Sequence, residues 1–121
     1  MTKPKKAKPF VFHASIIPYD WTVVLHTDEK AHTDFLTSRG CHIRPEQPDC
    51  VGWAVHYGNG TAILLRQVTA PVLLHELVHA VTRCFHDRGV PLSEDATEVL
   101  AYTLEKLFEE CTMALNKDYR P

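Results

Sequence analysis

The feature that most constrains the fold of this chain is an apolar run at residues 71–86, which carries His-Glu-Leu-Val-His at positions 75–79. Apolar residues recur there at i, i+3, i+4 and i+7, a spacing that predicts an amphipathic helix. Pro71 suits its first turn, and Gly89 with Pro91 should end it. Its predicted apolar face consists of Leu74, Leu77, Val78, Val81 and Phe85.

His75 and His79 lie one helical turn apart on an adjoining stripe of this helix. Two imidazoles at this spacing can converge on one tetrahedral ion, while Glu76 stands beside them without having to bind it. A chain with eight histidines will sometimes show His-x-x-x-His by accident. The added glutamate in a strongly apolar helix favours a zinc site, with Glu76 as general base.

The composition indicates an ordinary globular chain of one domain. Its 121 residues are 45% hydrophobic and 23% charged, with a formal net charge of −2, so overall charge does not favour nucleic acid as a partner. No run approaches the roughly 18 apolar residues of a membrane span, and no apolar segment follows the N-terminal lysines. We therefore expect a cytoplasmic protein without a membrane partner, with its four cysteines reduced.

Residues 1–9 are predicted to form a flexible basic tail, because this segment of lysines and prolines is too polar to pack into a core. Its lysines are Lys3, Lys5, Lys6 and Lys8. A solubilising role is favoured over a weak contact with nucleic acid. Residues 10–121 are then expected to form the single domain.

Four strand-like runs predict a small, mostly antiparallel sheet. Residues 10–17 and 21–26 are apolar or β-branched and are plausible sheet neighbours. Residues 51–57 and 61–66 flank Gly58-Asn59-Gly60, the pattern of a β-hairpin.

Between these pairs of strands, Thr27 is a candidate N-cap for a short helix that reaches about Ser38. Residues 41–50 read as a loop. Cys41, His42 and Cys50 could supply half of a metal site, but they lack the tight cysteine pair that structural zinc prefers.

A long amphipathic helix is predicted from Ser93, a good N-cap, to about Leu115, with Glu94 and Asp95 at the positive end of its dipole. Glu98 precedes Val-Leu-Ala in the sequence, so it is expected close to the buried side. The predicted apolar stripe comprises Val99, Leu100, Leu104, Leu107, Phe108, Cys111 and Leu115.

Two families that share His-Glu-x-x-His do not fit this chain. The metzincin pattern requires glycine at position 82 and histidine at position 85, where this chain has Thr82 and Phe85. Peptide deformylases take a cysteine ligand from Glu-Gly-Cys, and neither Cys41 nor Cys50 stands in that context.

The motif at residues 75–79, followed after eighteen residues by Glu98-Val-Leu-Ala, resembles the gluzincin arrangement of zinc metallopeptidases. This match covers residues 75–104. The segment Glu-x-x-Ala-Tyr at residues 98–102 and the short chain also resemble small phage and bacterial zincin-like metallopeptidases. The resemblance implies an α+β, minimal zincin-like domain, whose sheet has an edge strand along a cleft. The domain would also contain an active-site helix and a second, long C-terminal helix. If the chain is phage-encoded, the protein is expected in the host cytoplasm.

The resemblance also implies a reaction. Zinc held by His75, His79 and Glu98 keeps one position for water, and Glu76 takes the proton of that water and returns it to the leaving amine. The expected substrate is a protein or peptide, paired with residues 62–65 if these form the edge strand.

Several assignments stay open at this point. On the thermolysin pattern, Glu94 would be the third ligand and Glu98 its partner, although the spacing favours Glu98. The oxyanion donor is chosen from Tyr102, His86, Tyr119 and Arg120. As an alternative to catalysis, zinc could be structural in a binding or regulatory module, with His86 or a cysteine as fourth ligand. A further alternative is a nucleic-acid-associated protein that acts through the lysine tail.

Overall fold

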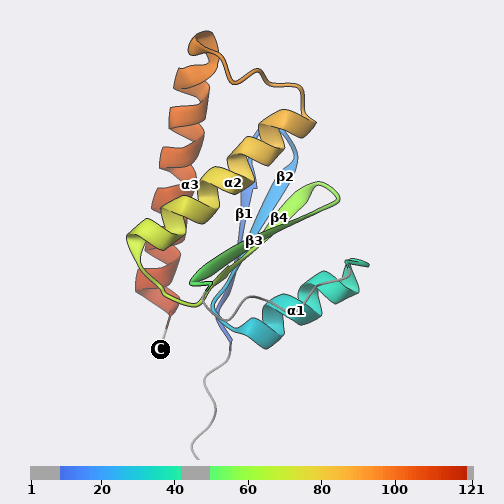
Figure 1. The fold of residues 1–121 in the computed structure, drawn as a ribbon. Coiled ribbons are helices and arrows are strands. Elements are labelled where there is room, and N and C mark those ends of the chain that lie inside the picture. The colour runs from blue at the N-terminus through green and yellow to red at the C-terminus, as the bar shows by residue number, and fades with distance from the viewer. Residues whose placement is uncertain (1–8, 42–49, 120–121) are drawn as a thin grey trace, which may run out of the picture.

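The computed structural model describes residues 9–41 and 50–119, which fold as an α+β domain of one four-stranded mixed sheet and three α-helices (Figure 1). The lysines of the predicted tail, and His42, lie outside the described residues. In chain order the elements are β1 (Val11–Ile16), β2 (Trp21–His26), α1 (Glu29–Ser38), β3 (Gly52–Tyr57), β4 (Gly60–Leu65), α2 (Ala70–Asp87), η1 (Glu94–Ala96) and α3 (Thr97–Asp118).

The sheet has the order β1-β2-β4-β3. The expected antiparallel neighbours β1 and β2, and the β3–β4 hairpin, are both confirmed. The central pair, β2 with β4, is parallel, so the sheet is mixed. The expectation that residues 62–65 form an edge strand is wrong: β4 is bonded on both sides, and β3 is the edge beside it.

Helices cover both faces of the sheet, which explains why β4 is buried along its whole length. α2 packs against β3, β4 and α3, and α3 packs against β1. α1 packs against β2 and β4 on the opposite face (Figure 1). Because side chains alternate along a strand, residues such as Val23 and Ile63 enter the main core under α2, while Val24 and Leu64 lie under α1.

The N-cap of α1 is Asp28, not Thr27 as predicted, because the Asp28 carboxylate accepts the backbone N–H of Lys30 at 3.3 Å. Between this helix and the sheet lie two buried histidines, His32 of α1 and His26 of β2, whose rings meet edge to face at 5.3 Å. The Nδ1 atoms of both rings have no hydrogen-bond partner among the described residues. Their neutral form is therefore the one that this packing accommodates.

The stability of the domain is expected to fall in acid. Burial, reinforced by the nearby His32, lowers the pKa of His26 from 6.5 to about 4, and burial lowers that of His32 too. Between pH 6.5 and pH 4, His26 binds a proton in the unfolded chain but not in the folded one. The free energy of unfolding should therefore drop by up to about 3 kcal/mol over this range from His26 alone.

Urea unfolding at pH 6.5 and pH 4 measures this drop. His26→Phe should flatten the dependence, while a change at the exposed His86, such as His86→Ala, should leave it unaltered. If the free energy of unfolding falls equally with pH in His26→Phe and in the wild type, His26 is not the cause of the drop.

The predicted helix at residues 71–86 is confirmed as α2, and Gly89 follows its end with a φ of 70°, in the left-handed region. Its buried face differs from the prediction: Leu74 and Val78 are 44% and 41% exposed. The buried face instead runs through Leu73, Glu76, Leu77, Ala80, Val81, Cys84 and Phe85. Packing against the sheet and α3 determines which face of α2 is buried. The apolar spacing in the sequence predicted a face shifted by one residue from the observed one.

The second long helix is confirmed, but its beginning is not as predicted. Ser93 caps a short 3-10 turn, η1, and α3 begins only at Thr97. The buried residues of α3 all lie from its middle onward: Leu107, Cys111 and Ala114. The expectation that Glu98 lies close to the buried side is wrong, since it is exposed in the first turn of α3. Figure 1 shows that this end of α3 extends past the sheet.

Candidate functional site

His75 and His79 project together from the outer surface of α2. Their Nε2 atoms are 3.3 Å apart, and their rings meet edge to face at 5.0 Å. The side chain of His75 is 69% exposed, so this pair of nitrogens is open to solvent. The i, i+4 spacing on a regular helix therefore brings two imidazole nitrogens, both possible metal ligands, to one accessible point.

Glu76 points from the same helix in a different direction, inward against β3. Its side chain is 7% exposed, and its Oε1 lies 3.9 Å from Nε2 of His75. Burial raises the pKa of Glu76 above its ordinary value, and the charges of His75 and His79 oppose this rise. A carboxylate of raised pKa beside two imidazoles suits proton transfer near neutral pH.

Gly52, the first residue of β3, makes room for Glu76. A Cβ at this position would lie 3.1 Å from Glu76 Cγ and 3.2 Å from its Oε1, and only 2.8 Å from Cγ1 of Val72. A glycine in a strand often marks such a close approach. The backbone of the edge strand therefore forms the wall against which the candidate base is held.

A pocket of about 420 Å³ opens between the start of β3 and the start of α2, beside His75 and Glu76. The pocket is mainly apolar, as binding sites for apolar side chains are. Its lining is Cys50, Val51, Gly52, Pro71, Val72, His75 and Glu76.

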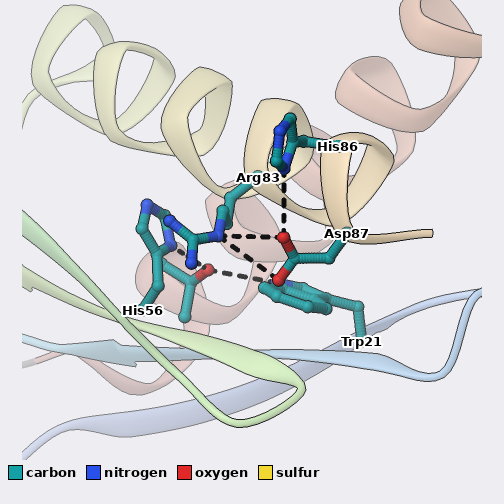
Figure 2. Close-up of polar contacts among 6 residues, drawn as sticks. Trp21, His56, Arg83, His86 and Asp87 are labelled. Atoms are coloured by element: carbon teal, nitrogen blue, oxygen red, sulfur yellow. Dashed lines mark hydrogen bonds and ion pairs between the residues drawn. The ribbon is translucent and has the colours of Figure 1, made fainter. Parts of the chain in front are cut away.

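The other residues predicted for the site are not gathered at the histidine pair. Glu94 and Glu98 are exposed in η1 and in the first turn of α3. His86 is exposed and interacts with Asp87 (Figure 2). Tyr102 is 67% exposed and lines a separate pocket with β1 residues. Tyr119 packs on Phe10, and Arg120 lies outside the described residues.

His56 is a polar residue near the site that sequence reasoning did not select. It lies on edge strand β3 and is partly buried, and its Nδ1 is 2.9 Å from Thr61 Oγ1 (Figure 2). Burial, with the nearby charges of Arg83 and His79, lowers its pKa. The alternation of the hairpin could have placed His56 on the same face as Gly52, but only the packing of α2 shows that this face borders the site.

The histidine pair fits a zinc ion in one measurable respect. Zinc–nitrogen bonds of about 2.0–2.1 Å at a tetrahedral angle put two ligand nitrogens about 3.3–3.4 Å apart. The separation of the two Nε2 atoms, 3.3 Å, matches this value. Across residues 9–41 and 50–119, however, no group of three or more His, Cys, Asp or Glu side chains is arranged to hold a metal. The third ligand thus stays a prediction.

Comparisons with protein-family models, curated proteins and solved structures find no match to this chain. In the part of the chain that the structure describes, no helix has the length and apolar character needed to cross a membrane.

Proposed function

We propose that this chain is a zinc-dependent metallopeptidase of gluzincin type with a minimal zincin-like fold. The observation that carries the proposal is the 3.3 Å separation of the His75 and His79 Nε2 atoms next to a buried glutamate. A hydrogen bond between two neutral imidazoles can also give this separation, but it would not account for the burial of Glu76 beside them.

His75 and His79 would hold the zinc ion, with Glu98 as the proposed third ligand. When bound, zinc supplies a Lewis acid that acidifies water and polarises a peptide carbonyl. Glu76 accepts the proton of the attacking water at its carboxylate and passes it to the leaving amine nitrogen. Its position against Gly52 keeps that carboxylate in one place between the two transfers.

The substrate proposed is an extended peptide that adds to the outer edge of β3, which pairs with no strand among the described residues. This strand borders both the Glu76 carboxylate and the 420 Å³ pocket, so a paired peptide would run past the base with one apolar side chain in the pocket. Main-chain pairing of this kind holds many sequences, with selectivity from the pocket.

Zinc analysis of the purified protein, paired with a peptide-library digest, tests the proposal. We expect one zinc per chain, cleavage that a chelator stops and zinc restores, and an apolar preference at one position next to the cleaved bond. Stoichiometric zinc without cleavage would indicate the structural module instead, and no zinc binding would contradict both.

Gly52→Ala is expected to lower the rate of peptide hydrolysis while zinc stays bound. The added methyl would collide with Val72 and Glu76, so the carboxylate must move although the histidines need not. Overpacking of this kind costs about 1–3 kcal/mol of stability. Steady-state kinetics, zinc content and the unfolding midpoint measure the three effects. Ala54→Gly, at the next position on the same face of β3, is the control and should keep Glu76 in place. Full activity in Gly52→Ala would contradict the role given to this contact.

A further inference from the structure

A buried hydrogen-bond relay leads from the core of the domain to His56 on edge strand β3. Trp21 Nε1–H donates to Thr61 Oγ1 at 3.1 Å, and Thr61 Oγ1 lies 2.9 Å from Nδ1 of His56. Trp21 and Thr61 are 1% and 0% exposed. Figure 2 shows the His56 ring standing up from the strand toward α2, with Trp21 below it.

The direction of each hydrogen bond in the relay follows from its donors. The indole N–H can only donate, so Thr61 Oγ1 accepts from Trp21. The proton of a buried hydroxyl needs an acceptor, and Nδ1 of His56 is the acceptor within reach of Thr61. Nδ1 of His56 therefore carries no proton, and the single N–H of the neutral ring is at Nε2, on the side away from Thr61.

His56 lies along the same face of β3 as the wall of the candidate site. Gly52, four residues earlier in the strand, contacts Glu76, and side chains at i and i+4 of a strand share a face. Farther along α2, the charges of His79 and Arg83 act on the His56 ring. β3 thus follows α2 from Glu76 toward the turn after His79, and a peptide paired to β3 would pass both Glu76 and His56.

We propose that His56 is a catalytic residue that donates its Nε2–H to the substrate carbonyl oxygen as negative charge develops there. This role rests on the proposed peptidase function. It fills the place for which the sequence suggested Tyr102, His86, Tyr119 and Arg120. The relay through Thr61 and Trp21 keeps the proton of His56 on Nε2, so the His56 ring need not reorganise during the reaction. Thr61 is by this argument a positioning residue.

Kinetics of matched variants test the proposal. His56→Ala is expected to lower kcat about 10²-fold or more with zinc content unchanged. His13→Ala, at an exposed histidine on β1, should keep wild-type kcat. Thr61→Val removes the hydroxyl that fixes the tautomer and should lower kcat about tenfold with little change in KM, whereas Thr61→Ser keeps the hydroxyl and the rate.

The outcomes separate this proposal from the proposed function. If the zinc-loaded wild type cleaves peptides and His56→Ala cleaves them equally fast, His56 is not the donor and the peptidase function stands. If the wild type cleaves nothing, both proposals fail.

A second measurement does not depend on activity or on a folded variant. Long-range ¹H–¹⁵N NMR of the wild-type imidazoles should show His56 protonated at Nε2 and bare at Nδ1. The opposite tautomer would overturn the relay and the proposal with it. In Thr61→Val the preference for one tautomer should weaken.

Discussion

Glu76→Gln is expected to keep one zinc per chain and to lose peptide hydrolysis by a factor of about 10²–10⁴. Glutamine has nearly the same shape, so it can occupy the space left by Gly52 against Val72 without disturbing the two histidines. Its amide cannot accept a proton from water at neutral pH, so only proton transfer is removed.

Metal analysis and single-turnover kinetics on the same preparation of Glu76→Gln measure both halves of this result. Glu105→Gln, at an exposed position of α3, controls for the loss of one negative charge and should match the wild type. Turnover at the wild-type rate in Glu76→Gln would rule out Glu76 as the base.

His75→Ala and His79→Ala are each expected to weaken zinc binding by more than about 100-fold, because even residues that only support a ligand cost 10–100-fold when changed. The two Nε2 atoms lie 3.3 Å apart, so removal of either ring leaves half of the converging pair. Titration of the apoprotein with zinc against a competing chelator measures the affinity, and hydrolysis should fall in parallel. His86→Ala is the matched control on the same helix. Wild-type affinity in either site variant would contradict the proposed metal site.

The same titration identifies the third ligand. The sequence predicts a large loss of affinity in Glu98→Ala and a small one in Glu94→Ala. Both residues are exposed and apart from the histidine pair in this structure, so a loss in Glu98→Ala would also mean that zinc draws the beginning of α3 toward α2. Equal affinity in both variants would remove Glu98 from the site.

The sequence alone could determine features that depend on neighbours along the chain. Helical spacing was enough to put His75 and His79 on one stripe of a helix, and the Gly58-Asn59-Gly60 turn was enough to predict the β3–β4 hairpin. These are local effects, since an i, i+4 pair and a short turn are set by backbone geometry.

Only the tertiary structure decided which of these elements meet. The parallel pairing of β2 with β4 puts β4 inside the sheet and leaves β3 as the edge. No local sequence pattern predicts this strand order. The packing of α2 along β3 then turns Glu76 inward against Gly52 and brings His56 to the same side. The short buried part of α3 leaves Glu98 exposed. Such contacts depend on how whole elements bury their apolar faces together, which residue spacing within one element does not specify.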